Sequence, residues 1–184
     1  FKNNELKFPY KYWTGKENLK NKNILLFHEQ GYGDTIQFAR YTKLVLEMGA
    51  NVFVAVTTNL AQLFSTLDER IKIVTHTIIN HPIDYQCPLM SLPHRFKTNI
   101  DTIPDQIPYL FSSKDKKRFF EKKMKKTNKF KIGLAWSGRS NHVNDHNRSI
   151  KLKELASIIR PEFKYVCLQK DIKKDFQLPC MNLC

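Results

Sequence analysis

Long apolar runs and paired cysteines are scarce in this chain, and each shortage excludes a class of protein. No run approaches the roughly 18 apolar residues that a membrane-spanning helix needs, so no transmembrane segment is expected. The cysteines Cys87, Cys167, Cys180 and Cys184 are scattered and show no paired spacing typical of a zinc site. We expect a soluble cytoplasmic protein with reduced thiols.

Several catalytic and targeting patterns are also absent. No Gly-x-Ser-x-Gly occurs, which leaves acyl-enzyme hydrolysis unsupported, and Gly31-Tyr32-Gly33 lacks the third glycine of a dinucleotide-binding loop. The chain starts at Phe1 without a basic and apolar leader, and it stops at Cys184 after a strand-like stretch. These features predict a fragment at both ends.

Apolar periodicity predicts an α/β fold. Hydrophobic residues make up 41% of the 184 residues, which is enough for a core. Apolar runs predict strands at 23–29, 51–56 and 71–74, and helical spacing predicts helices at 34–49 and 59–67. This βαβαβ order indicates a parallel sheet.

The remaining part of the chain begins with a proline-punctuated stretch and then resumes the alternation of strands and helices. Proline interrupts regular elements, so this stretch is predicted to be a loop-rich wall at 81–110. The predicted elements, in chain order, are a short strand at 84–87, a helical turn at 90–96, a lysine-rich helix from 114, a strand at 130–136, a helix at 149–159 and a strand at 165–169.

These elements suggest one complete domain followed by the beginning of a second one. Residues 1–22 are polar and aromatic and are interpreted as a lead-in segment or linker. A Rossmann-like domain is predicted over 23–112, a linking helix over 113–128, and the truncated start of a second Rossmann-like domain over 129–184.

The turn after the first predicted strand forms a candidate site. Glycines at 31 and 33 permit backbone dihedrals that other residues resist, so the chain can turn sharply there and place Asp34 at the carboxyl edge of the sheet. His28 and Glu29 would flank it. Asp34 is also a favoured N-cap with Gln37 three residues later, and this structural role is compatible with a chemical one.

A second candidate site lies in the polar segment 137–148. This segment brings basic side chains to the amino end of a helix predicted to be capped by Ser149, where free amides and the helix dipole attract anions such as phosphate. A surface loop without function is the alternative. The basic side chains are Arg139, His142, His146 and Arg148. A metal is not expected, because a loop of this composition fixes no ligand geometry.

The net charge of +14 raises the possibility of a polyanion partner. Its densest segment, Lys114 to Lys131, carries Phe119, Phe120 and Met124 at helical spacing. We interpret this segment as a helix with one solvated face that packs by its other side. Nucleic acid is therefore not expected as a partner.

Several motifs together resemble the glycosyltransferase-like domain that follows tetratricopeptide repeats in many bacterial proteins. The family is similar in turn to glycosyltransferase family 9, the heptosyltransferases. Tyr32 and Lys151 depart from the family, which more often has Leu and Pro there. The matching residues are Trp13 and Gly15, residues 28–41, residues 84–93, Ile103-Pro104, residues 108–110, residues 133–138, Asn144-Asp145, residues 147–150 and residues 168–170.

This resemblance implies a GT-B fold of two Rossmann-like halves and an inverting, metal-independent transfer without a cofactor. Asp34 would be the catalytic base of the acceptor half. Residues matching the acceptor side would bind substrate, namely His28, Gln30, Gly31 and Gly33. Residues matching the donor side would bind the donor phosphates, namely Ser137, Gly138, Arg139, Asn147, Arg148 and Lys170.

The resemblance also implies partners. They are a nucleotide-sugar donor, a glycan or protein acceptor, and tetratricopeptide repeats on the amino-terminal side of the parent chain. The later donor-binding elements of the family are missing, so this fragment is expected to be inactive by itself. A non-catalytic module that binds anions or nucleic acid, or serves as a scaffold, is the alternative.

Overall fold

The chain divides into two units, residues 1–113 and residues 114–184. Within the described residues no helix is both long enough and apolar enough to cross a membrane. The computed structural model describes residues 8–75, 79–124, 126–138, 143–169 and 181–183.

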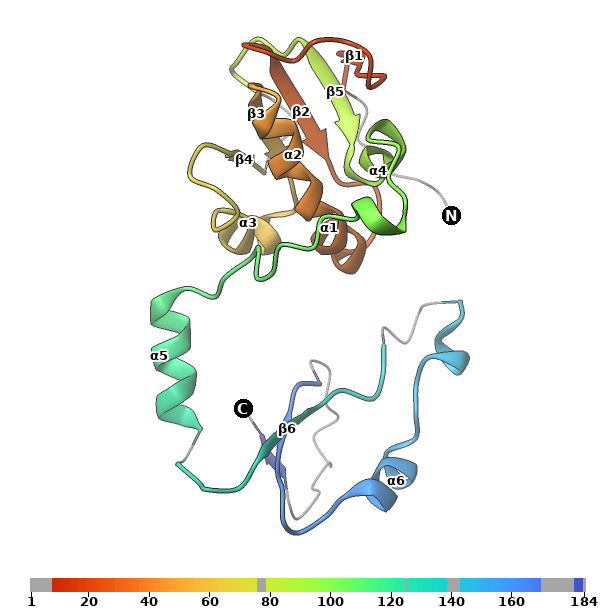
Figure 1. Ribbon diagram of the computed structural model, residues 1–184. Coiled ribbons are helices and arrows are strands. Elements are labelled where there is room, and N and C mark those ends of the chain that lie inside the picture. The colour runs from red at the N-terminus through yellow and green to blue at the C-terminus, as the bar shows by residue number, and fades with distance from the viewer. Residues whose placement is uncertain (1–7, 76–78, 125, 139–142, 170–180, 184) are drawn as a thin grey trace. The chain divides into compact units, whose positions relative to one another are not determined.

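The first unit is built on a five-stranded parallel sheet (Figure 1), which confirms the predicted α/β class. The strand order is β1-β5-β2-β3-β4. The strands are β1 (Lys11–Tyr12), β2 (Asn23–Phe27), β3 (Asn51–Ala55), β4 (Lys72–Val74) and β5 (Tyr85–Pro88).

The helix predicted over 34–49 forms in three consecutive pieces. They are α1 (Tyr32–Phe38), the 3-10 turn η1 (Ala39–Tyr41) and α2 (Thr42–Glu47). Gly49 ends the run with a φ of 81°, a left-handed conformation that glycine adopts without strain, as predicted. The next crossover contains α3 (Thr58–Phe64).

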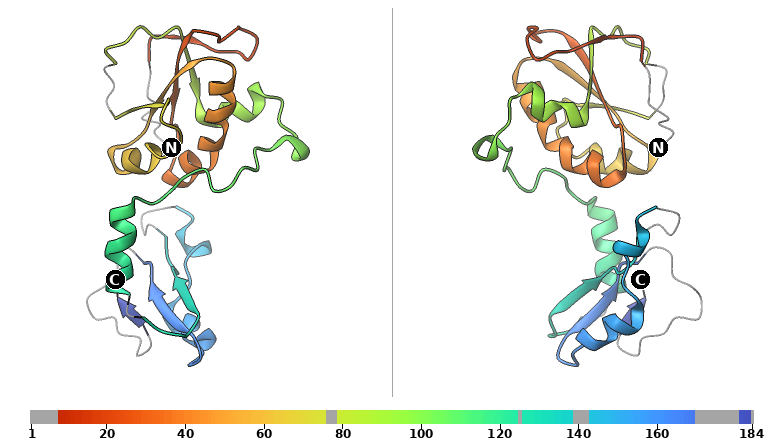
Figure 2. Two further views of the ribbon diagram at one scale, coloured as in Figure 1. Left: turned by 60° about the vertical axis from the view of Figure 1, so that its left-hand side comes forward. Right: turned by 90° about the vertical axis from the view of Figure 1, so that its right-hand side faces the viewer.

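Helices cover one face of this sheet (Figures 1 and 2). The alternate strand residues Ile24, Leu26, Val52 and Val54 face a core that includes Phe64 of α3. The opposite face is also buried, because Leu25, Phe27, Phe53 and Ala55 pack with Phe8. Burial on both faces explains why these strands appear in the sequence as continuous apolar runs.

Residues 8–22 are part of the first unit rather than a lead-in or linker. Lys11–Tyr12 forms the edge strand β1 beside β5. Trp13 and Leu19 are 1% and 0% exposed and belong to the main core. A strand of two residues is too short for hydrophobic periodicity to reveal, which is why it was not predicted.

A buried glutamine on β5 holds this amino-terminal segment. Gln86 is 1% exposed, and its side-chain amide donates to the carbonyl oxygens of Phe8, at 2.9 Å, and Tyr10. Its backbone carbonyl accepts a hydrogen bond from the Trp13 amide at 2.9 Å. The buried donor of this side chain is therefore satisfied, whereas its buried Oε1 has no hydrogen-bond partner among the described residues.

Asp84 joins the amino ends of β5 and β2. Its carboxylate accepts the Asn23 amide at 2.8 Å, and its own amide donates to the Asn23 carbonyl at 2.9 Å. Lys22 lies 3.4 Å from the same carboxylate. The Asn23 amide, with a smaller contribution from Lys22, lowers the pKa of Asp84.

The remaining helices of the first unit follow β5. The short strand and helical turn predicted over 84–96 are confirmed in position. The elements are η2 (Leu89–Ser91), α4 (Leu92–Arg95) and η3 (Ile100–Thr102).

The second unit contains a three-stranded parallel sheet in the order β6-β7-β8. The helix predicted over 149–159 is reduced to a four-residue α-helix and a 3-10 turn. Its elements are α5 (Lys114–Lys123), β6 (Lys131–Leu134), η4 (Asp145–Asn147), α6 (Leu152–Leu155), η5 (Ala156–Ile158), β7 (Lys164–Cys167) and β8 (Met181–Leu183).

Gly15 is required by the backbone of the first unit. Its φ of +92° is unfavourable for other residues, and an added Cβ would lie 3.0 Å from the Arg95 carbonyl oxygen. Gly15→Ala should therefore lower the free energy of unfolding by about 2 kcal/mol. Urea denaturation followed by fluorescence of the buried Trp13 measures this loss.

Gly33→Ala is the matched control. Gly33 has no left-handed φ, and an added Cβ meets no atom within 4 Å. We expect no loss of stability from this change, since alanine favours helix over glycine. Equal unfolding midpoints for Gly15→Ala and the unsubstituted chain would contradict the prediction.

Candidate functional site

The strand order creates a topological switch point at β2. The chain moves from β2 outward through β3 to β4, then returns to place β5 on the other side of β2. The segments after β2 and β5 therefore leave the carboxyl edge in different directions. Open α/β sheets bind ligands in the crevice at such a point.

Asp34 lies in the first turn of α1, directly after this edge. The helix begins at Tyr32 with Gly31 as the N-cap, so Asp34 is the third helical residue and the predicted N-cap role is wrong. Its Oδ2 accepts the Gly31 amide at 3.1 Å. The carboxylate thus reaches back to the N-cap, as the acidic residue of a capping box does.

This arrangement leaves half of the carboxylate available. Asp34 is half-buried, and in the part of the chain that the structure describes its Oδ1 has no hydrogen-bond or ion-pair partner. One oxygen is therefore fixed by the backbone, and the other is free to accept a hydrogen bond from a ligand.

Neither glycine beside Asp34 adopts a backbone conformation that other residues would resist, so this prediction is wrong. Gly31 has a φ of −68° and Gly33 is helical, so neither position needs a left-handed conformation. A Cβ on Gly33 would meet no atom within 4 Å. Because the fold does not require a glycine there, the open space it leaves is available for close approach by a ligand.

Two neighbours of Asp34 are placed by the strand that precedes it. His28 is half-buried, and burial lowers its pKa, so the imidazole is neutral near pH 7. Glu29 accepts the Met90 amide at 3.3 Å, which joins the loop after β2 to η2 after β5. Gln30 is exposed. The interactions found among the described residues do not connect these side chains to Asp34.

Tyr32 and Asn59 were not predicted as site residues. Asn59 lies in α3, which follows β3, and its side-chain amide donates to the Tyr32 hydroxyl oxygen at 2.7 Å. The Tyr32 ring is 45% exposed at the carboxyl edge. The sequence offered one signal for Tyr32, because the family that the chain resembles more often has Leu at this position.

Cys87 lies at the same edge but is not a nucleophile. It is fully buried at the end of β5. Burial raises the pKa of its thiol to about 11, against a smaller opposing effect of Arg95. The thiolate that cysteine chemistry requires is therefore absent at neutral pH.

An apolar pocket lies at the end of α1, after Asp34 in the chain. Gln37 and Phe38 follow Asp34 by three and four residues, so they share its face of the helix. The pocket has a volume of about 560 Å3. Its lining residues are Gln37, Phe38, Arg40, Tyr41, Pro93, Thr98, Asn99, Ile100 and Ile103. The sequence did not reveal it, because its walls are separated by about half the first unit.

In the second unit, the amides after β6 are already hydrogen-bonded. The Oε1 of Gln169 accepts the amides of both Trp136 and Ser137 at 3.1 Å. Its Nε2 donates to the Ser137 carbonyl at 3.0 Å. The free amides expected for phosphate binding are therefore occupied at these two positions.

The next amide is occupied as well. The Gly138 amide donates to the Ser149 hydroxyl at 3.1 Å, and that hydroxyl donates to Asp145 at 2.8 Å. Ser149 is thus bonded within the loop, and α6 begins only at Leu152. The prediction that Ser149 caps this helix is wrong.

Arg148 lies beside Gly138, and an acidic group accompanies it. A Cβ on Gly138 would lie 3.2 Å from an Asp145 carboxylate oxygen and 3.7 Å from an Arg148 guanidinium nitrogen. The carboxylate weakens the attraction of this site for anions. Asn147 donates its side-chain amide to Asn144 at 2.7 Å.

Part of the predicted donor site cannot be placed. Arg139, His142 and Lys170 lie outside the described residues. The structure brings together Ser137, Gly138 and Arg148, but Asp34 belongs to the other unit. Among the described residues no group of three His, Cys, Asp or Glu side chains could hold a metal ion.

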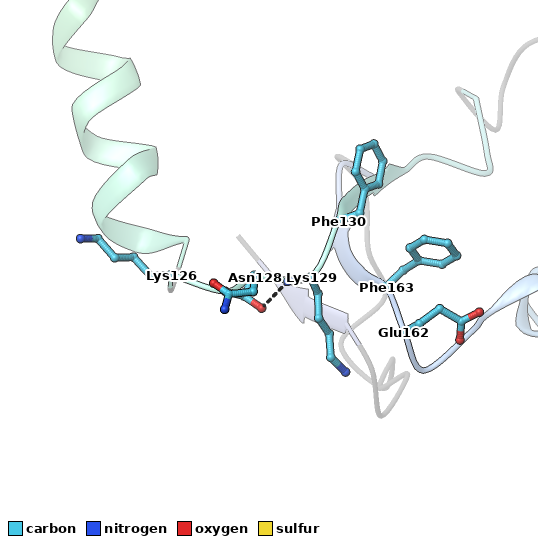
Figure 3. Close-up of a pocket in the computed structure, with 7 residues that line it drawn as sticks. Lys126, Asn128, Lys129, Phe130, Glu162 and Phe163 are labelled. Atoms are coloured by element: carbon cyan, nitrogen blue, oxygen red, sulfur yellow. Dashed lines mark hydrogen bonds between the residues drawn. The ribbon is translucent and has the colours of Figure 1, made fainter.

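A further pocket of about 660 Å3 lies at the amino ends of β6 and β7 (Figure 3). Phe130 and Phe163 meet there with ring centroids 6.4 Å apart, beside Lys126 and Glu162. The Lys129 ammonium donates to the Pro161 carbonyl at 2.6 Å. This is the strand edge opposite to the one that binds ligands in parallel sheets.

Comparisons with known proteins give no match to a protein family, a curated protein or a solved structure. A function for this chain is therefore inferred from its residues and their geometry.

Replacing Gln169 with alanine should release the amides of Trp136 and Ser137. Loss of the acceptor should speed their hydrogen exchange by about fivefold to tenfold, the effect of one hydrogen bond of about 1 kcal/mol. Exchange measured by mass spectrometry on peptides covering β6 and the residues after it tests this. Asn128→Ala, an exposed change at the opposite edge of the same sheet, should leave these amides unchanged. Unaltered exchange in Gln169→Ala would contradict the assignment.

Proposed function

We propose that this chain belongs to a glycosyltransferase that moves a sugar from a nucleotide donor to an acceptor hydroxyl with inversion. The observation that carries the proposal is Asp34 at the switch-point edge, with one carboxylate oxygen held by Gly31 and the other free. The resemblance to the repeat-associated glycosyltransferase family supports the same assignment of Asp34.

The proposed reaction is a single displacement. The free oxygen of Asp34 accepts the proton of the acceptor hydroxyl while the hydroxyl oxygen attacks C1 of the donor sugar. The bond from C1 to the phosphate oxygen breaks, and its electron pair leaves with the nucleoside diphosphate. The products are an inverted glycoside, the nucleoside diphosphate and a protonated Asp34.

The surroundings of Asp34 fit an acceptor. The open space at Gly33 admits a group close to the helix backbone. The pocket beyond Gln37 offers apolar walls for a part of the acceptor that does not react. Tyr32, held by Asn59, supplies an exposed ring at the same edge.

The donor diphosphate would use the second unit. Arg148 supplies a cation that stabilises the charge developing on the leaving group. Because the amides at 136–138 already have acceptors, phosphate binding there would replace the hydrogen bonds from Gln169 and Ser149. Arg139 and Lys170 lie outside the described residues, so their roles in donor binding stay predictions from the sequence.

Asp34→Asn in the full-length protein should abolish most of the glycosyl transfer. An amide cannot accept the acceptor proton, so kcat should fall by about 100-fold or more. Release of nucleoside diphosphate from a panel of nucleotide sugars with candidate acceptors measures the rate. The melting temperature should change little, because asparagine retains an oxygen that can accept the Gly31 amide.

Asp115→Asn is the control for this experiment. Asp115 also lies in the first turn of a helix, α5, and it is exposed, so the same chemical change should leave the rate unaltered. A wild-type rate in Asp34→Asn would remove Asp34 from the role of base. Failure of every donor and acceptor pair to react with the unsubstituted protein would overturn the proposed function.

Gly33→Ala should separate stability from activity. It should stabilise the fold by up to about 1 kcal/mol, since alanine is the better helix former. It should also slow transfer at least about tenfold, because its methyl group enters the space proposed for the acceptor. Unfolding and transfer assays on the same preparation test both effects, and undiminished transfer would show that the acceptor does not approach Gly33.

A further inference from the structure

The excess positive charge of this protein is concentrated in one unit. Residues 1–113 hold 12 Lys and Arg against 10 Asp and Glu, whereas residues 114–184 hold 19 against 7. The second unit therefore carries nearly all of the net charge of +14. The proposed glycosyl transfer gives no reason for so large an imbalance.

Helix α5 and the residues after it carry most of this charge. Residues 114–131 contain 10 Lys and Arg and only 2 Asp and Glu. No residue of α5 is buried. The expectation that this helix packs by its other side is therefore not met, and its charged groups are accessible.

Two aromatic side chains of α5 are exposed together with the charges. Phe119 and Phe120 are 53% and 42% exposed, and their rings meet edge to face at 5.2 Å. The Lys123 ammonium lies 4.8 Å from the centre of the Phe119 ring. Exposing two neighbouring phenyl rings to water is unfavourable, so their transfer to an apolar phase would stabilise the bound state.

We propose that α5 docks on an anionic lipid bilayer surface. A helix of ten residues, about 15 Å long, would lie in the plane of the headgroups. Its lysines would contact lipid phosphates and carboxylates, and Phe119 and Phe120 would enter the boundary with the acyl chains. The long lysine stems allow the ammonium groups to reach the headgroups from beside the rings.

The pair of phenylalanines favours a bilayer over nucleic acid. A duplex offers phosphates to the lysines, but its surface gives two adjacent phenyl rings no apolar phase to enter. A bilayer satisfies both kinds of side chain at the same place. The proposal is independent of Asp34 and of glycosyl transfer.

Co-sedimentation of the whole chain with lipid vesicles tests this proposal. Binding to phosphatidylcholine vesicles containing about 30% phosphatidylserine should be at least about tenfold stronger than binding to phosphatidylcholine alone. It should weaken as salt is raised, since the attraction to the charged surface is screened.

Two double variants separate the apolar and charged contributions. Phe119→Ser with Phe120→Ser should weaken binding to the anionic vesicles about tenfold at every salt concentration. Lys117→Gln with Lys122→Gln should weaken it about tenfold at low salt and much less at high salt. These side chains are exposed, so circular dichroism should show the fold intact.

Lys16→Gln with Lys20→Gln is the matched control. Both lysines are exposed in the first unit, and this change should leave vesicle binding within about twofold of the unsubstituted chain. An equal loss in this control would mean that net charge alone drives the attraction.

Three outcomes would overturn the proposal. Equal binding to neutral and anionic vesicles would remove the role of the lysines. Tighter binding to random duplex DNA, insensitive to the phenylalanine changes, would make nucleic acid the partner. No binding to either would leave α5 a solvated helix.

A Phe119→Trp variant tests insertion directly. An unshifted fluorescence maximum on adding anionic vesicles would contradict insertion at this position.

Discussion

The pairing of β5 with β2 is the contact on which the candidate site depends. Asp84 fixes the amino ends of the two strands by exchanging hydrogen bonds with Asn23. At the other end, Glu29 accepts the Met90 amide and so joins the loops that leave the two strands. Because β5 lies beside β2, the chain changes direction there and a switch point forms next to Asp34.

The two candidate sites differ in how their polar groups are satisfied. Around Asp34 the backbone holds one carboxylate oxygen and leaves the other free, so a ligand finds an oriented group. In the second unit Gln169 and Ser149 occupy the amides after β6, and Asp145 accompanies Arg148. A group held in position loses little freedom on binding a ligand, whereas amides with partners must first exchange them.

The central strands of the first sheet, β2 and β3, were predictable because they are buried on both faces. Continuous apolar runs predicted β2, β3 and β4 to within two residues, and the short strand β5 was predicted to within one residue, although it includes Pro88. The position of Asp34 near the carboxyl edge followed from the order of strand, glycine turn and helix. Its first-turn location did not fix its role, since a shift of three residues separates an N-cap from the residue that bonds back to it.

Local pattern by itself determined the α/β class, the strands of the main core and the concentration of charge from Lys114 onward. Only the tertiary structure decided that Lys11–Tyr12 is a strand, that a pocket lies at the end of α1, and that Gln169 bonds amides 32 and 33 residues earlier in the chain. The physical reason is the range of the interactions. The periodic burial of side chains is visible in residues that are neighbours in the sequence. Hydrogen-bond partners and pocket walls come from distant segments that folding brings together.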